Sequence, residues 1–395
     1  MDFDDTPAEH AFRTEVREWL DANVEPRYRT GSASIGLANV NNANYADECR
    51  TWQRRLFDGG WAGLTWPAGF GGRGAGIMDQ LIFGQEQNRY AVPTGLFLVA
   101  ANMVGPTLIA HGTDAQRQEH LLPILRGDEV WCQLFSEPNA GSDLASVQTR
   151  AVRDGDEFVV NGQKVWTSYA QYADRAILLA RTGPPDSGRA GITYLLCDMR
   201  DPGVEVRPLR QITGAVHFNE VFLTDVRIPV ADVVGGVDAG WAVARTTLGS
   251  ERAMIGGLAN TSAVLADLVD LARDRGRARD AVVRQALARV HADARVLEFL
   301  GFRLQTALSQ GRMPGPEASV LKLLLSRQLQ RIGSLGVEIE GASGMLWTEA
   351  GGHDGGWQQR LCDQFAVRLG GGTDEVQRNI VAERVLGLPR EPTAG

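Results

Sequence analysis

The stretch "WCQLFSEPNAGSDLASVQTRAVRDGDEFVVNGQKVWTS", residues 131–168, decides the fold. It contains short runs of β-branched and aromatic residues that are separated by turn signals such as "RDGD". Such runs are typical of strands, because these side chains pack well on a pleated surface. The Asn-Gly pair in "VVNGQKV" has alternating flanks and predicts a tight hairpin at Asn161 and Gly162. The stretch therefore predicts a mainly antiparallel β domain.

Helical periodicity lies on both sides of this region. Thr6 and Pro7 are residue types that favour a helix start, and apolar residues then recur on one helical face. This first face comprises Phe12, Val16, Trp19 and Leu20. Near the other end, a second apolar stripe comprises Val283, Leu287, Val290, Ala294 and Leu297.

The order of these patterns predicts an α+β chain of three domains. We expect an N-terminal α-helical domain over residues 1–130, a central antiparallel β domain over 131–237, and a C-terminal four-helix bundle over 238–395. Alternating βαβ units are absent from the sequence pattern, which argues against a doubly wound nucleotide-binding fold.

Composition narrows the class of protein. The 395 residues carry a net charge of −8 and 44% apolar residues, which is typical of a globular protein with a large core. The acidic balance argues against a nucleic-acid partner. No apolar run reaches the roughly 20 residues of a membrane span, and "MDFDDTPAEH" does not resemble a secretory signal. The four cysteines are isolated in the sequence, which predicts buried thiols in a reducing compartment. The histidines form no ligand pair, which argues against a zinc site. We therefore expect a cytoplasmic protein.

Two segments carry candidate chemistry. "SEPNAGSD" is a polar turn whose N–H and O–H groups could bind a phosphate or a heteroaromatic edge, although such clusters are often ordinary loops. "RLGGGTDEVQRN" places three glycines directly before a predicted helix, where the backbone can approach a ligand closely. No Lys-Ser or Lys-Thr follows these glycines, which excludes a phosphate loop of the Walker type.

Five ordered blocks resemble the acyl-CoA dehydrogenase family. They are "GWAGLTWPAGFGG", "FSEPNAGSD", "GDEFVVNGQKVWTS", "FNEVFLTDVRIP" and "GGTDEVQRNIVAERVLG". The resemblance implies FAD held between subunits of a homotetramer or a related assembly, an acyl-CoA substrate, and electron transfer to an electron-transferring flavoprotein. The implied reaction removes the α-proton of an acyl thioester, moves the β-hydride to flavin N5, and yields the trans-2-enoyl-CoA.

The resemblance also implies roles for single residues around the flavin. Trp166 would stack beside the isoalloxazine ring, although a tryptophan in the core of the sheet is the plain alternative. Ser168 would bond near the N5 edge, and Ser142 would serve the diphosphate and the pantetheine arm. The remaining flavin contacts implied are Gln133, Phe135, Ser136, Thr373 and Glu375, and Thr373 is also a plain N-cap candidate.

The position of the catalytic base separates two lineages of this family. Many members place a glutamate directly before the "GT" of the loop, where this chain has Gly371. The second lineage takes its base from a Glu-Arg pair on a bundle helix, which corresponds here to Glu251 and Arg252. The plain alternative is a surface Glu-Arg couple. Gly371 would then contribute a backbone N–H to the thioester oxygen, and Gly372 would contact the substrate.

The resemblance weakens where the family contacts the FAD of a neighbouring subunit. The usual "R-x-x-F-G" element is missing, and Arg277 or Arg284 would have to replace it, with a solvated helix residue as the plain alternative for each. Glu338 stands where a glutamine is common. The chain therefore also resembles the catalytic half of a heterotetramer with a second acyl-CoA dehydrogenase chain, of the kind that acts on bulky steroid-like or branched acyl-CoAs. Two further alternatives are a non-catalytic subunit and an oxidase on the same fold, but oxidases of this kind generally carry an additional C-terminal helical domain.

Overall fold

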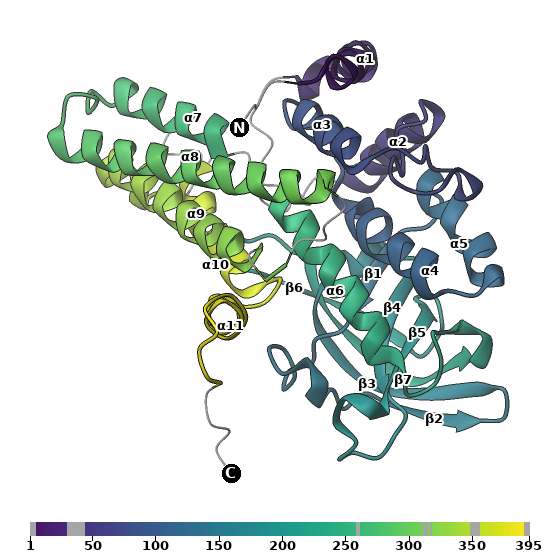
Figure 1. Ribbon diagram of the computed structural model, residues 1–395. Helices are drawn as coiled ribbons and strands as arrows, with labels where there is room; N and C mark the ends of the chain where they lie inside the picture. The colour runs from purple at the N-terminus through teal and green to yellow at the C-terminus, as the bar shows by residue number, and fades with distance from the viewer. Residues whose placement is uncertain are drawn as a thin grey trace.

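The structure is a computed structural model that describes residues 5–29, 44–257, 261–310, 315–316, 318–347 and 356–390. Within these ranges, the side chains of residues 252–257, 261–263, 305, 308 and 309 are not described. The described chain has a helical N-terminal region, a central sheet and a C-terminal group of helices, as predicted (Figure 1).

The N-terminal region is built from α-helices that are joined by loops and short 3-10 turns. They are α1 (Pro7–Asn23), α2 (Tyr45–Asp58), α3 (Ile77–Gln87), α4 (Gly105–His111) and α5 (Asp114–Arg126). Thr6 caps α1 as predicted, because its side chain accepts a hydrogen bond from the backbone N–H of Glu9. The predicted apolar face is confirmed: Val16 and Leu20 are buried, and Phe12 and Trp19 pack against them.

The central region is one mixed sheet whose strand order is β6-β7-β3-β2-β4-β5-β8, with β1 paired to β4. Its strands are β1 (Trp131–Leu134), β2 (Arg150–Asp154), β3 (Glu157–Ser168), β4 (Arg175–Arg181), β5 (Ile192–Asp198), β6 (Val204–Leu209), β7 (Phe218–Pro229) and β8 (Val233–Val234). Most neighbours are antiparallel, and parallel pairing occurs where β1 and the first residue of β2 meet β4.

The hairpin predicted at Asn161 and Gly162 is wrong. Strand β3 runs straight through both residues, and its register against β7 shifts between Val160 and Gly162. Gly162 is needed there for space, since a Cβ atom would lie 2.4 Å from Oγ1 of Thr149. The turn lies instead at Gly155, which has a φ of 61° between β2 and β3.

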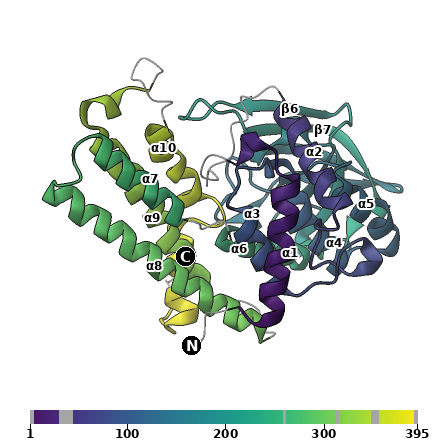
Figure 2. The ribbon, with the colours of Figure 1, turned by 90° about the horizontal axis from the view of Figure 1, so that it is seen from above.

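The C-terminal region is a group of packed helices. They are α6 (Gly240–Gly257), α7 (Thr261–Asp274), α8 (Ala281–Ser309), α9 (Ala318–Glu340), α10 (Gly356–Leu369) and α11 (Asp374–Ile380). The predicted stripe on α8 is confirmed: Val283, Val290, Ala294 and Leu297 are buried, and Leu287 packs against the cluster that contains Val283 and Val290. Viewed from above, α7 to α10 form a layer beside the N-terminal helices and the sheet (Figure 2).

Helix α6 runs between this layer and the sheet (Figure 1). Gly240 lets the helix start directly against β5, because a Cβ atom there would lie 2.3 Å from the backbone N of Tyr194. Farther along the helix, Oγ1 of Thr247 lies 2.9 Å from Oγ1 of Thr107 and 3.1 Å from the hydroxyl of Tyr194. These contacts fix the depth of α6 against both the sheet and α4.

Candidate active site

The segment that leaves β1 carries the first group of predicted flavin contacts. Gln133 is half-buried on β1, and Phe135 is buried with its ring edge-on to Tyr194 at 5.9 Å between centroids. The carbonyl of Ser136 accepts a hydrogen bond from Val165 of β3 at 2.9 Å. The main chain at Ser136 is therefore held beside the strand that carries the second group.

A buried ion pair holds the turn that follows. Nζ of Lys164, which has no exposed surface, donates to Glu137 at 2.8 Å and to the carbonyls of Phe135 and Leu179 at 3.1 and 2.8 Å. Burial lowers the pKa of Lys164 to about 8, although Glu137 opposes this shift. Burial also acts to raise the pKa of Glu137. The charge of Lys164 and the hydrogen bonds that the Glu137 carboxylate accepts outweigh burial, so the pKa of Glu137 lies below its usual value.

The pair of Lys164 and Glu137 was not predicted from the sequence, although a signal for it was present. Lys164 has the same parity along β3 as the buried residues Phe158 and Val160, so it falls on the inward face of the strand. A lysine on an inward face needs a buried acceptor. Glu137 supplies it, and its other oxygen accepts from the backbone N–H of Gln148 at 2.6 Å.

Trp166 lies outside the core of the sheet, at an irregular point in β3. Its φ of 61° is left-handed, and the register against β7 shifts between Lys164 and Thr167. The indole is 61% exposed and meets the edge of Phe218 at 5.9 Å. Ser168 is half-buried and pairs with Phe218 across the strands. An aromatic ring on a rigid strand with one face open is suited to stack on a flat ligand.

Ser142 is exposed in the loop between β1 and β2. It lies five residues after Glu137, whose carboxylate accepts hydrogen bonds from the backbone N–H groups of Gln148 and Thr149. The loop is therefore tied down at both ends while the serine hydroxyl faces solvent.

The glycine loop is held in a conformation that glycine favours. Gly371 and Gly372 have φ angles of 62° and 87°, which residues with a side chain rarely adopt. Nε2 of Gln377 donates to the carbonyl of Gly371 at 2.9 Å. Thr373 caps α11 by accepting a hydrogen bond from Val376 N–H at 3.2 Å, and the exposed Glu375 pairs with Arg378 at 2.8 Å. Because Gly371 has no side chain, only its backbone groups can take part in chemistry at this position.

A second buried carboxylate anchors the loop to α9. Asp374 is 2% exposed; one of its oxygens accepts from Ser326 at 2.8 Å and Lys322 at 3.2 Å, and the other accepts from Arg368 at 3.0 Å. Burial acts to raise the pKa of Asp374, but these donors outweigh it, so the pKa lies below its usual value. This cluster was not predicted from the sequence, because its members are up to 52 residues apart.

Glu251 lies on α6 and is half-buried. It follows Thr247 by four residues, so it continues the helical row that faces the interior. Arg252 is the next residue of the helix, and its side chain lies outside the described residues. A cavity of about 400 Å³ is lined by Ala242, Arg245, Thr246 and Leu248 of α6 and by Arg384, which follows the glycine loop. The first half of the helix that carries Glu251 therefore shares a cavity with Arg384, which lies 13 residues after Gly371.

The structure brings together two residues that were predicted at a neighbouring subunit's FAD. Arg277 donates to the backbone carbonyl of Glu338 at 2.6 Å and to the carboxylate of Asp280 at 3.0 Å. The Glu338 side chain is exposed, as is Arg284 on α8. The contact between Arg277 and Glu338 places both at one surface, at the start of α8 and the end of α9.

The thiols lie mainly in the core, as predicted. Cys49, Cys132 and Cys197 are buried, Cys362 is half-buried, and all four are free. Burial raises the pKa of Cys197 to about 12, so this thiol is inert at neutral pH. Among the described residues, no group of three or more His, Cys, Asp or Glu side chains could hold a metal ion. No helix in the same part of the chain is long and apolar enough to cross a membrane.

Comparison with known families decides what this arrangement belongs to. Residues 6–128, 132–226 and 238–386 match the N-terminal, middle and C-terminal domain models of acyl-CoA dehydrogenase. The chain belongs to the acyl-CoA dehydrogenase family. It is therefore an oxidoreductase of the acyl-CoA dehydrogenase type, and members of this family depend on FAD.

Named relatives of this dehydrogenase cover almost its full length. It is 40% identical over 390 residues to the acyl-CoA dehydrogenase IpdE1 of Mycobacterium tuberculosis, covering 96% of this chain and 98% of the relative. A solved structure named Tcur3481-Tcur3483 steroid ACAD matches with a TM-score of 0.84 and 33% identity, covering 99% of this chain and 100% of that chain. The ChsE4-ChsE5 complex from Mycobacterium tuberculosis matches with a TM-score of 0.83 and 34% identity, over the same shares.

The residues of this dehydrogenase fit the flavin ring of FAD. The open indole of Trp166 offers a stacking face, and Gln133 of β1, Ser136 in the turn after it and Ser168 of β3 are half-buried polar residues that could bond the edge of a ring. In addition, Oγ1 of Thr167 is buried without a hydrogen-bond partner among the described residues. A buried hydroxyl without a partner is costly, so a ligand atom that bonds it would stabilise this part of β3.

Proposed function

We propose that the chain catalyses the α,β-dehydrogenation of an acyl-CoA thioester to the trans-2-enoyl-CoA, with Glu251 as the base. Two observations together carry this proposal. Glu251 on α6 is a half-buried carboxylate, and position 371 of the loop is a glycine that has no carboxylate. Gly371 has no side chain, and its φ of 62° disfavours one. A carboxylate shielded from water is suited to take the weakly acidic α-proton.

The backbone and neighbouring groups would position the substrate. The N–H groups of Gly371 and Gly372 would donate to the thioester oxygen and stabilise the negative charge that develops on it when the α-proton leaves. Ser142 and Arg252 would contact the CoA arm. Lys322 and Asp374 support this geometry indirectly, because they fix the loop that carries both glycines.

The cofactor would be held by both ends of the site. Gln133, Phe135, Ser136, Trp166 and Ser168 would hold the ring, and Thr373 and Glu375 would contact the adenine half. FAD, when bound, supplies the acceptor for the β-hydrogen and its electrons. We further propose that an electron-transferring flavoprotein then removes these electrons, as in other members of the family.

The test is product formation by the FAD-loaded chain. It would be incubated with acyl-CoAs that range from short linear to ring-bearing, together with an artificial electron acceptor. The proposal expects at least one thioester whose mass falls by two hydrogen atoms and whose product is the trans-2-enoyl isomer. The absence of such a product across the panel, with FAD bound, would refute it.

A second candidate concerns assembly and substrate size. The chain is similar to two solved structures, at 33% and 34% identity, that are named as a steroid ACAD and as a two-protein complex. Arg277 is already engaged by Asp280 and by the Glu338 carbonyl, so its contribution to a neighbour's FAD would need these bonds to change. We therefore propose, as the alternative, a heterotetramer with a second acyl-CoA dehydrogenase chain that acts on bulky steroid-like or branched acyl-CoAs.

Flavin stoichiometry distinguishes the two assemblies. The chain expressed alone would be analysed by gel filtration, and its visible absorbance would be converted to flavin per polypeptide. A homotetramer with a full complement of FAD would contradict the alternative. A chain that lacks flavin alone but retains it when expressed with a second dehydrogenase chain would support the alternative.

A further inference from the structure

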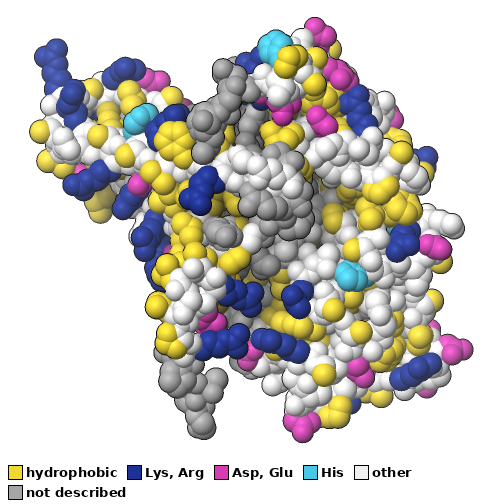
Figure 3. All heavy atoms as spheres, in the orientation of Figure 1, with side chains coloured by type: hydrophobic (Ala, Val, Ile, Leu, Met, Phe, Trp, Pro, Cys, Tyr) yellow, Lys and Arg dark blue, Asp and Glu magenta, His cyan; other side chains and the backbone are white. Residues whose placement is uncertain are grey.

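The cavity between α6 and the C-terminal segment is cationic. Arg245 lies on α6, and Arg384 lies in the π-helical turn Val381–Val385 that follows α11. Both guanidinium groups are exposed, and Thr246 adds a half-buried hydroxyl to the same cavity. On this face of the molecule, Lys and Arg side chains gather between α11 and α6 (Figure 3).

Neither arginine is used by the fold. Within the described residues, the guanidinium groups of Arg245 and Arg384 form no ion pair, hydrogen bond or ring contact. By contrast, the neighbouring Glu383 is already engaged by Arg390 at 3.2 Å. The carboxylate closest in sequence to Arg384 therefore has its own partner.

A third cation extends the same surface. Arg189 lies over the ring of Trp241 at 5.1 Å from its centroid. Trp241 precedes Arg245 by four residues on α6, so the two side chains are neighbours on one helical face. In a chain of net charge −8, unpaired cations converging on one cavity create a local field that attracts an anion.

We propose that Arg245 and Arg384 bind the phosphate groups of the CoA arm of the substrate. This inference rests on the proposed function, and it names residues that recognise the part of the substrate remote from the chemistry. Guanidinium groups suit this task because they donate in a planar fork that matches phosphate oxygens. Thr246 is placed to donate a further hydrogen bond, although its hydroxyl already lies 2.8 Å from Nε2 of His111.

The position along α6 agrees with this assignment. Arg245 precedes Glu251 by six residues, which corresponds to about 9 Å along the helix axis. The pantetheine arm separates the thioester from the phosphates, so the base and the phosphate site must lie apart on the same side of the protein. Helix α6 carries both, and the cavity opens to solvent where a long polar arm can leave the site.

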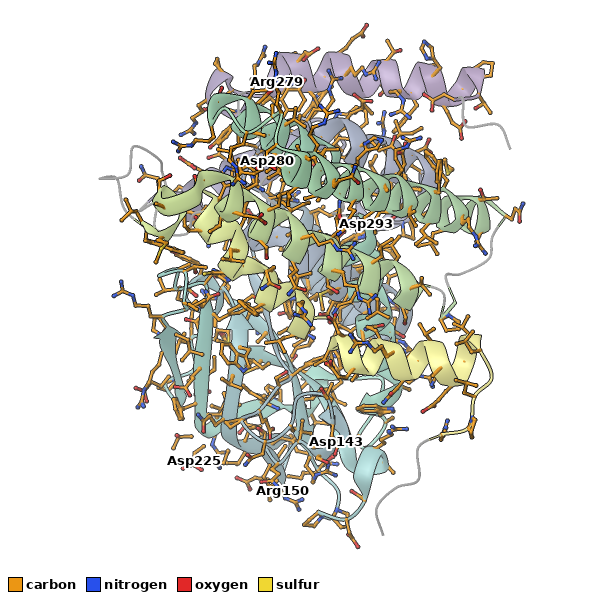
Figure 4. All side chains as sticks on the ribbon, turned by 90° about the vertical axis from the view of Figure 1, so that its left-hand side faces the viewer. Asp143, Arg150, Asp225, Arg279, Asp280 and Asp293 are labelled. Atoms are coloured by element: carbon orange, nitrogen blue, oxygen red, sulfur yellow. The ribbon has the colours of Figure 1, made fainter. Side chains whose placement is uncertain are left out.

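The test compares ligands with and without phosphates. Arg245→Gln, Arg384→Gln and the double variant would be prepared as FAD-loaded enzyme, together with any second chain that the assembly requires. The matched control is Arg279→Gln: Arg279 is exposed on the turn between α7 and α8 and is labelled in Figure 4. That turn projects at the end of the bundle away from α6 (Figures 1 and 2).

The main readout is the Kd of free CoA and of pantetheine by calorimetry, which does not depend on turnover. We expect the double variant to weaken CoA binding by about tenfold or more, since hydrogen bonds to charged groups are among the stronger ones. Pantetheine binding should stay within about twofold, because no phosphate contact is lost. The Kd of CoA should also rise less steeply with salt in the double variant than in the wild type.

Three results would overturn the proposal. They are an unchanged Kd for CoA, an equal loss for CoA and pantetheine, and a loss of FAD from the variants, which would assign the arginines to the cofactor. A wild-type enzyme that binds CoA in this phosphate-dependent manner but oxidises no acyl-CoA would refute the proposed reaction and leave the phosphate site standing.

Discussion

Replacing Lys164 by methionine tests whether the buried ion pair under the "SEPNAGSD" turn holds the flavin-binding segment in place. Methionine keeps most of the length and the apolar stem of the side chain, but it removes the charged donor. The change leaves Glu137 and the carbonyls of Phe135 and Leu179 without the Nζ group that bonds all three.

The expected cost follows from these three acceptors. A buried acceptor that loses its partner costs about 1 to 3 kcal/mol, and removing one member of a buried ion pair costs about 3 to 5 kcal/mol in total. Glu137 keeps the N–H groups of Gln148 and Thr149, and it is able to take up a proton, so the loss stays at the total for one broken ion pair and does not grow with each acceptor. We therefore expect a loss of about 3 to 5 kcal/mol, or roughly 10² to 10⁴ in the unfolding equilibrium constant.

Urea unfolding followed by near-UV circular dichroism measures this loss through the midpoint and the slope. Arg207→Met is the matched control, because its pair with Glu205 on β6 is exposed to solvent and its loss should leave the urea midpoint almost unchanged. The double variant Lys164→Met with Glu137→Gln should be less unstable than the sum of its single changes, since it leaves no unpaired charge. A loss below about 1 kcal/mol for Lys164→Met would refute this account of the turn.

Three further predictions concern residues near the proposed site. Burial lowers the pKa of His217 to about 4. The folded protein therefore holds fewer protons than the unfolded chain between about pH 6.5 and 4, and stability falls with acidification by up to about 3 kcal/mol. His217→Gln should flatten this part of the stability profile, and an unchanged profile would contradict the assignment. Trp166→Ala should raise the Kd of FAD by roughly two- to tenfold in a flavin titration, while the urea midpoint stays near that of the wild type because the indole is 61% exposed; an unchanged Kd would remove its stacking role. Gly371→Ala should cost about 1 to 2 kcal/mol in urea unfolding because of its left-handed φ of 62°. Gly84→Ala in α3, where a Cβ atom meets nothing within 4 Å, should instead be neutral or stabilising, and equal effects of the two changes would speak against backbone strain at Gly371.

The sequence was sufficient for features that depend on local periodicity. The apolar faces of α1 and α8 and the order of helices, sheet and helices follow from spacing alone, and the structure confirms them. The Asn-Gly pair misled because local turn propensity competes with tertiary packing. At Gly162 the close approach of Thr149 and the continuous pairing of β3 with β7 decide the conformation.

Contacts between distant segments could not be predicted in this way. Arg277 meets the Glu338 carbonyl across 61 residues, and Lys322 meets Asp374 across 52. Neither pair shares a helical or strand period, so no pattern in the sequence links them. Lys164 is an intermediate case. Its place on the inward face of β3, by alternation with Phe158 and Val160, indicates a buried charge, but only the structure identifies Glu137 as its partner.

The central claim is that Glu251, rather than a residue of the glycine loop, removes the α-proton. The direct measurement is the rate of flavin bleaching when FAD-loaded enzyme is mixed with an active acyl-CoA without oxygen, in the wild type and in Glu251→Gln. Glu18→Gln, which changes an exposed carboxylate on α1, is the control. We expect a rate at least about 10²-fold lower for Glu251→Gln with flavin content unchanged, and a near-normal rate for Glu18→Gln. A near-normal rate for Glu251→Gln would contradict it.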